Sequence, residues 1–586
     1  MRCKLIPRCC ISTFVYVFSI IVISVESKPS DLYEEPVVLT GLGHVRGSVL
    51  RSRLGELFYA FRGIRYAKSP VGDLRFKAPE PIEQWDKVFD ATRDGPMCPQ
   101  PTDDWTEVSE DCLRLNIYTH EISKKSSNTT VKKPVIVYIH PGGFYGVSGQ
   151  SKNFAGPQIL MDRDIVLVTM NYRLGSLGLL SLGTSEYPGN AAFKDQVLAL
   201  KWVKYHISHF GGDPNLVTLM GYSAGAVAAS LHMVSPMSKS LFHRAIIMGG
   251  AATAQWKIPK HQLEIAERQA KILDCPIDSM DDMMDCLKSR PARDFGNSLV
   301  NMFEFSHGNP ILIWYPVIEK DFGQERFLIE NPTKLMRQGR FMRVPVIAGI
   351  TEHEFLGPAI AILKSDEDRL KFDSNFSTYA PISFLYERNT NRSEEISAKL
   401  RKEYLNEAFF DDQSSLAGLS HLFSDGVVGF GVHRFVKLAA AFTRVYYYRH
   451  SYVGRFSHVY YPDNKPYGAV HHDDLLYLFA VPSVAKMFKI TDPENLHVER
   501  FTRMWASFAL RGDPNRLNDE VIRDIRWRQM LPNRFNYLDM GEEYQMKDKM
   551  YAERYAIWDG LFPLPNRRRS KEMVKYSPLN SNNLVG

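Results

Sequence analysis

The sequence predicts an α/β architecture with a large, mostly parallel central sheet flanked by helices. Short runs rich in Val, Ile and Tyr recur along the chain, each bounded by Gly, Pro or Asn. They are residues 135–139, 165–172, 216–220, 245–248, 344–350 and 444–448. These runs are continuously apolar, which is typical of strands buried on both faces of a parallel sheet. Helical segments lie between them, most clearly at residues 190–210, and such alternation of strand and helix indicates the α/β class.

Length and composition agree with a globular protein that buries a large core. The chain has 586 residues, of which 44% are hydrophobic and 24% are charged, the balance of a soluble globular protein. Its net charge is +6, and part of that excess comes from residues 567–569, Arg-Arg-Arg. The remaining sequence has no long basic and aromatic stripe, so we expect no nucleic-acid binding.

The first 27 residues have the features of a signal peptide. A basic start precedes an apolar run over residues 9–25, and the small residues Val25 and Ser27 suit cleavage after Ser27. An uncleaved membrane anchor is the alternative, because the run is near the upper length for a signal. No second apolar stretch of spanning length follows. We therefore expect a secreted, extracellular protein without a stable membrane anchor.

The rest of the chain divides into one large domain and a tail. Residues 28–562 contain no internal repeat and no linker that would split the middle of the chain. Residues 563–586 are rich in Pro, Arg and Ser, so we expect a polar, basic and poorly ordered tail. The sequence does not indicate an oligomeric state.

Cysteines and glycosylation sequons agree with the secretory route. Four cysteines follow the signal: Cys98, Cys112, Cys275 and Cys286. An even number in a secreted chain suggests two disulfides. None has the C-x-x-C spacing of a zinc site, so we expect no metal. Polar segments carry sequons at Asn128, Asn375 and Asn391, which are compatible with glycosylation.

The stretch GYSAG, residues 221–225, places a serine between two glycines. It follows the predicted strand 216–220 and precedes an Ala-rich helix start. This strand–turn–helix placement is that of the nucleophile elbow in α/β-hydrolases. The tight turn would expose Ser223 Oγ above the sheet, and the Ala224 N–H would face a developing oxyanion at the N-terminus of the helix.

A second glycine-rich turn follows the strand at residues 135–139. In the sequence YIHPGGFYG, Gly142 and Gly143 would offer backbone N–H groups where a carbonyl oxygen becomes negative. An ordinary glycine turn after a strand is the alternative interpretation.

A catalytic serine of this kind needs an acid and a histidine later in the chain, in that order. Glu352 and Glu354 stand just after the predicted strand 344–350, and His471 and His472 follow a turn. Spacing alone does not choose between the two glutamates or between the two histidines.

At these residues the chain resembles the type-B carboxylesterase and cholinesterase family of α/β-hydrolases, over roughly residues 36–560. The shared motifs occur in the family's order. They are FRGIRYAKSPVGDLRF (61–76), EDCLRLNIYT (110–119), NYRLGSLGLL (171–180), FGGDPNLVTLMGYSAGA (210–226) and GAVHHDD (468–474). The HPGGF form of the glycine turn is most similar to that of secreted insect carboxylesterases, including those described from venom.

The resemblance implies a catalytic site and an activity. It places the nucleophile on Ser223, the acid on Glu354 and the base on His471. Further implied residues are the oxyanion donors Gly142, Gly143 and Ala224, and the disulfides Cys98–Cys112 and Cys275–Cys286. The implied enzyme is a carboxylic ester hydrolase that cleaves small-molecule esters through an acyl-enzyme. It needs neither a metal nor a cofactor.

Three positions depart from the family's pattern. Pro141 replaces the first glycine of the usual triple and has no N–H to donate. Gly249 stands where many relatives have a serine near the catalytic residues, and Arg65 replaces a common proline. The alternative is therefore a catalytically weak or inactive adhesion or binding protein of the same fold.

Juvenile hormone esterase and cholinesterase are minor alternatives. Tyr222 stands where juvenile hormone esterases typically carry Gln and cholinesterases carry Glu. We expect Tyr222 to form an aromatic wall of the substrate site, which suits uncharged acyl or alcohol groups. Trp105 could imitate the tryptophan with which cholinesterases bind a quaternary ammonium, although ordinary packing is the favoured interpretation.

Overall fold

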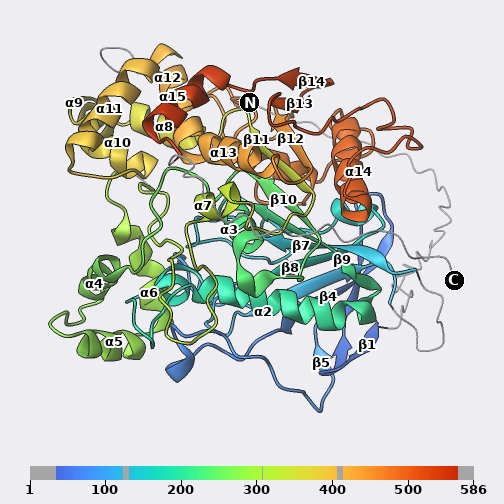
Figure 1. Cartoon of the computed structure of the whole chain (residues 1–586). Coiled ribbons are helices and arrows are strands. Elements are labelled where there is room, and N and C mark those ends of the chain that lie inside the picture. Colours follow the sequence, from blue (N-terminus) through green and yellow to red (C-terminus); the bar gives the residue numbers. More distant parts are fainter. Residues whose placement is uncertain (1–34, 123–130, 307, 406–412, 565–586) are drawn as a thin grey trace, which may run out of the picture. The chain divides into compact units, whose positions relative to one another are not determined.

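The computed structural model describes residues 35–122, 131–306, 308–405 and 413–564 (Figure 1). At its centre is an eleven-stranded sheet. The strands, in spatial order, are β14 (Tyr544–Asp548), β13 (Asn536–Met540), β12 (Val445–His450), β11 (Val346–Thr351), β10 (Arg244–Met248), β9 (Gly212–Tyr222), β7 (Lys133–Ile139), β8 (Val166–Met170), β6 (Arg114–Thr119), β4 (Leu57–Arg65) and β3 (Ser48–Arg51). Strands β13 to β8 in this order pair in parallel, and antiparallel strands extend both ends.

The predicted fold class is confirmed, because the six apolar runs become the central strands β7 to β12. Strands β8 and β11 are buried at every position, as expected where both faces of a parallel sheet are covered. The outer strand β14 is mostly exposed. It lacks a continuous apolar run, which explains why the sequence pattern missed it.

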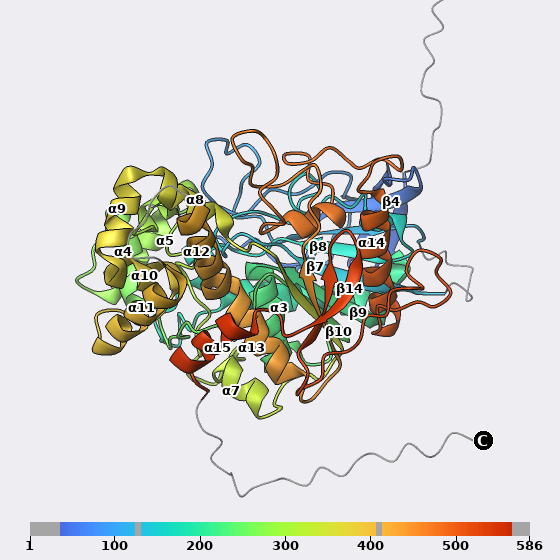
Figure 2. The same ribbon diagram turned by 90° about the horizontal axis from the view of Figure 1, so that it is seen from above.

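Helices cover the two faces of the sheet, and alternate side chains of each strand point to opposite cores. Leu219 and Ile247 belong to the core that includes α2 (Ala191–His206), α3 (Ala224–Val234) and α13 (Phe430–Ala439). Met220 and Ile246 belong to the core under α14 (Asn495–Arg511). Figure 2 shows α3 and α14 on either side of the strands.

A group of helices beside the sheet forms a third core of its own (Figures 1 and 2). It comprises α8 (Leu356–Lys364), α9 (Asp366–Ser374), α10 (Phe376–Phe384), α11 (Asn391–Tyr404), α12 (Gln413–Phe423) and α15 (Ala552–Leu561). A π-helical turn, Ser424–Gly429, joins α12 to α13. Other elements are the small sheet β1 (Val37–Thr40), β2 (Gly43–Arg46) and β5 (Phe89–Asp90), and the helices α1 (Gly175–Leu179), α4 (Leu263–Ile272), α5 (Met280–Ser289), α6 (Ala292–Ser298) and α7 (Pro332–Arg337).

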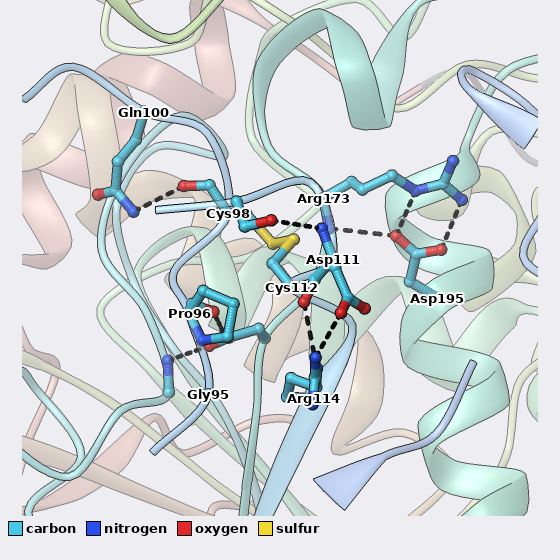
Figure 3. Close-up of a disulfide and its surroundings, with 12 residues drawn as sticks. Gly95, Pro96, Cys98, Gln100, Asp111, Cys112, Arg114, Arg173 and Asp195 are labelled. Atoms are coloured by element: carbon cyan, nitrogen blue, oxygen red, sulfur yellow. Dashed lines mark hydrogen bonds and ion pairs between the residues drawn. A yellow bond between two sulfur atoms is a disulfide. The ribbon is translucent and has the colours of Figure 1, made fainter. Parts of the chain in front are cut away.

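The described residues contain two disulfides, and their pairing agrees with the one that the resemblance implied. Cys98 is joined to Cys112 (Figure 3), and Cys275 is joined to Cys286. Within the described residues, no helix is both long and apolar enough to cross a membrane. The predicted signal peptide, the sequon Asn128 and the tail beyond residue 564 lie outside the described residues.

Candidate active site

The turn between β9 and α3 has the geometry expected of a nucleophile elbow. Ser223 has φ 53° and ψ −119°, a conformation that costs energy for a residue with a side chain. A methyl group added at Gly221 would lie 2.0 Å from the Gly225 carbonyl oxygen, and one at Gly225 would lie 2.1 Å from that of Ile139. Both flanking glycines are therefore required by close backbone approach.

A chain of hydrogen bonds runs from this serine to a buried carboxylate. His471 Nε2 lies 3.0 Å from Ser223 Oγ, and His471 Nδ1 is hydrogen-bonded to Glu354 Oε2. The other oxygen of Glu354 accepts the N–H of Thr351, the last residue of β11, at 2.9 Å. Glu354 is fully buried, so its orientation is fixed by these two partners.

The structure distinguishes the residues that sequence spacing left open. Glu352 is partly exposed and pairs with Arg449 at 3.1 Å instead of reaching the histidine. The ring of His472 lies beside that of His471, with centroids 4.2 Å apart, but its Nε2 has no hydrogen-bond partner within the described residues. Burial lowers the pKa of His472 well below its ordinary value, and the neighbouring His471 lowers it further.

The glycine turn after β7 lies against the elbow. Gly142 and Gly143 have φ values of +110° and +59°, which favour glycine. The Gly142 carbonyl accepts the N–H groups of Tyr145 and Gly146, each at 2.9 Å, and this closes a tight loop. Ala224 is the first residue of α3, where a backbone N–H has no intrahelical acceptor.

Gln100 connects this loop to the Cys98–Cys112 disulfide (Figure 3). Its side-chain oxygen accepts the N–H of Val147 at 2.7 Å. Its amide nitrogen donates to the carbonyls of Cys98 and Val147, both at 3.1 Å. Sequence reasoning missed this role, because a lone Gln near a cysteine has no diagnostic pattern.

A narrow, mainly apolar cavity opens beside Ser223. Its walls include Trp256, Ile311, Leu312, Phe355, Leu385 and Val427, and Gly143 and Ala224 also line it. Phe355 follows Glu354 directly, and its ring lies 4.3 Å from the ring of His471. Among the described residues, no ionisable side chain lines this cavity. These apolar residues were not predicted as site residues, because they come from segments far apart in the sequence.

The expectation that Tyr222 forms a wall of the substrate site is wrong, whereas ordinary packing, the favoured interpretation of Trp105, agrees with the structure. Tyr222 does not line the cavity. It is fully buried in the core on the α14 side of the sheet, because its side chain leaves β9 on the opposite face from the cavity. Trp105 is not in the cavity either: it donates to the Thr102 carbonyl at 2.9 Å, and its ring lies so close to Gly296 that a methyl group there would come within 2.6 Å.

The three departures from the family's pattern have different surroundings. Arg65 pairs with Asp111 and does not line the cavity. Pro141 precedes the two glycines and accepts a hydrogen bond from His140 on its carbonyl oxygen at 2.7 Å. A methyl group at Gly249 would lie 3.2 Å from His471 Cε1, so this glycine leaves space directly beside the histidine.

No candidate metal centre was found: in the described part of the chain, no three His, Cys, Asp or Glu residues are grouped to hold an ion. What the described residues do contain is a serine just after β9, a buried glutamate just after β11 and a histidine in hydrogen-bond contact with both. Fold and site together define the class: this is an α/β-hydrolase.

Comparisons with known proteins specify the family. The model of the carboxylesterase family matches residues 34–558. A juvenile hormone esterase from Tribolium castaneum is 35% identical over 506 residues, which are 82% of this chain and 84% of that protein. Venom carboxylesterase-6 from Apis mellifera is 33% identical over 519 residues, 86% of this chain and 90% of that protein.

A solved structure is similar over nearly the whole chain. It is the crystal structure of juvenile hormone esterase from Manduca sexta, with OTFP covalently attached. The TM-score is 0.78 at 27% identity, and the match covers 90% of this chain and 100% of that one. The chain therefore belongs to the carboxylesterase family and is a carboxylic ester hydrolase, acting on small-molecule esters.

Proposed function

We propose that Ser223, His471 and Glu354 are the catalytic triad of this esterase. Ser223 Oγ attacks the ester carbonyl carbon while His471 Nε2 takes its proton, and the same histidine then protonates the leaving alcohol. The resulting acyl-enzyme is hydrolysed by a water that His471 activates. Glu354 holds the imidazole in the required tautomer. The observation that carries the proposal is the 3.0 Å contact between Ser223 Oγ and His471 Nε2.

The backbone N–H groups of Gly142, Gly143 and Ala224 are the proposed oxyanion donors. Support comes from Gly143 and Ala224, which line the same cavity as Ser223, and from the tight turn that places Gly142 directly before Gly143. Loss of one such donor typically costs about 2.7–4 kcal/mol of transition-state stabilisation. Pro141 has no N–H to donate. The proposed oxyanion hole therefore consists of the N–H groups of Gly142, Gly143 and Ala224.

The substrate is a neutral ester with apolar groups. The cavity walls are apolar, and an uncompensated quaternary ammonium buried there would lose its hydration. The Tyr222 side chain faces the core and makes no contribution to the cavity, so the preference for neutral esters follows from the walls themselves.

The protein is secreted after removal of residues 1–27, and residues 28–562 form the esterase domain. Support comes from the basic and apolar start of the sequence and from two disulfides, which persist in oxidising compartments. Asn375 and Asn391 are both exposed at the ends of helices in the third core. Glycans at these two positions would project into solvent.

Labelling with an organophosphate tests the triad directly. The wild-type protein should bind one phosphoryl group at Ser223, detected by peptide mass spectrometry, and should lose its activity on p-nitrophenyl butyrate. Ser223→Ala should be folded, as judged by its melting temperature, and should neither react nor hydrolyse. A Ser223→Ala protein that keeps wild-type turnover would refute the proposed mechanism, and label at another residue would move the nucleophile there.

A further inference from the structure

Tyr222 precedes the nucleophile but lies outside the substrate cavity, and its hydroxyl has a defined partner. The side chain is fully buried. Its oxygen accepts the backbone N–H of His472 at 2.8 Å. The ring also lies behind the histidines, with its centroid 5.2 Å from that of His471 and 5.1 Å from that of His472. The residue before the nucleophile therefore contacts the residue after the proposed base.

The segment that this hydrogen bond holds is strained. His472 has φ 81° and ψ −7°, a left-handed conformation that a residue with a side chain adopts only when its surroundings enforce it. Upstream, the chain is fixed by the N–H of His353, which donates to the Ala469 carbonyl at 2.9 Å. Directly after His471, the chain is held by the hydrogen bond from the His472 N–H to Tyr222.

A second buried group lies beside the Tyr222 side chain. The carboxyl of Asp474 accepts the hydroxyl of Tyr448 at 3.0 Å and is close enough to Tyr222 for each group to affect the pKa of the other. Tyr448 comes from β12 and Tyr222 from β9, so tyrosines of two strands of the sheet meet at this carboxyl.

We propose that Tyr222 is a positioning residue for the catalytic base. By binding the His472 N–H, it fixes the His471–His472 peptide against the nucleophile turn and keeps His471 Nε2 within reach of Ser223 Oγ. The proposal rests on the roles assigned above to Ser223 and His471. In this role Tyr222 acts on the catalytic base without contacting the substrate.

The test compares Tyr222→Phe with a matched variant, Tyr138→Phe. Tyr138 is an equally buried tyrosine on the neighbouring strand β7, and its hydroxyl has no hydrogen-bond partner within the described residues. Each change removes one hydroxyl and no ring. Active sites are counted by end-point titration with a fluorophosphonate, so that kcat on p-nitrophenyl butyrate refers only to folded, reactive molecules.

Tyr222→Phe should lower kcat per titrated site by about tenfold and leave KM within about twofold, because the histidine acts on the reacting atoms and not on substrate binding. The rate of phosphonylation should fall in parallel, and Tyr138→Phe should match the wild type. If Tyr222→Phe lowers only the melting temperature and keeps kcat per site within about twofold, the tyrosine is structural and the proposal is wrong. An active Ser223→Ala would instead refute the proposed triad, and the two failures are thereby distinguished.

Discussion

Asp474 makes the stability of this protein depend on pH in an unusual direction. Burial, and after it the negative charge of Glu354, together raise the pKa of this fully buried carboxyl to about 8. The titratable groups that face it are Glu354, Tyr222, Tyr448, Asp473 and Tyr138, and none of them is a cation. We therefore expect Asp474 to carry a proton in the folded protein at neutral pH.

The sign of the effect follows from the raised pKa. In the unfolded chain the carboxyl ionises near pH 4, whereas in the folded protein it ionises near pH 8. Its stabilising contribution is complete below the unfolded pKa and is lost as the pH rises toward the folded one. Each pH unit between them costs about 1.4 kcal/mol. Asn cannot ionise, so the free energy of unfolding of Asp474→Asn does not have this pH dependence. Its stability relative to wild type should therefore increase by about 2–3 kcal/mol between about pH 5 and pH 7.

Urea unfolding of the two proteins at four pH values from about 5 to 8 measures this difference. Asp473→Asn is the matched control, because Asp473 accepts hydrogen bonds from Ser457 Oγ at 2.7 Å and from the Val470 N–H at 3.0 Å. The control should be less stable than wild type at every pH. If the gain of Asp474→Asn does not grow with pH, Asp474 is ionised in the folded protein and the reasoning fails.

Three further predictions concern the elbow, the oxyanion loop and the cavity. Gly225→Ala should destabilise the protein by about 1–3 kcal/mol or more and abolish turnover, because its methyl group would meet a backbone oxygen. Thermal unfolding would show this, and Gly357→Ala on α8, where nothing lies within 4 Å, should be at least as stable as wild type. Gln100→Ala should lower kcat by about tenfold with little change in KM, since the loop that bears the oxyanion donors loses its tether. Gln84→Ala, which removes only an exposed hydrogen bond to Gly41, serves as its control. Equal kcat values for the two variants would show that Gln100 does not support the oxyanion loop. Neutral aryl or alkyl esters should be preferred to acetylcholine by at least about tenfold in kcat/KM, which is about 1.4 kcal/mol. Equal specificity constants, measured side by side, would contradict the proposed preference of the apolar cavity for neutral esters.

The sequence predicted the parts of the molecule whose local pattern is strong. Continuous apolar runs identified β7 to β12, and the glycines around Ser223 identified the elbow, because both patterns are short in sequence. The choice of Glu354 over Glu352 depends on which carboxylate turns inward after β11, and spacing in a charged loop carries no such information. The choice of Glu354 came from the family resemblance.

The orientation of Tyr222 was predicted wrongly for a related reason. Its position beside Ser223 suggested contact with substrate, but adjacent residues at the end of a strand point to opposite faces. The serine turns toward the cavity and the tyrosine enters the α14 core. Residues such as Ile311, Leu385 and Val427 could not be predicted at all, because only tertiary folding brings these segments to one cavity.

The cavity walls and the reacting groups have different origins in the fold. Ser223 and Glu354 are anchored at the ends of sheet strands, whereas Ile311 lies on a long connection and Leu385 and Val427 belong to the helical region beside the sheet. Exchange of Ile311, Leu385 or Val427 should thus leave the hydrogen bonds of the reacting groups intact. Substrate range and catalytic power can therefore diverge independently: new ester preferences are accessible by single substitutions in the helical region, while the sheet keeps the chemistry unchanged.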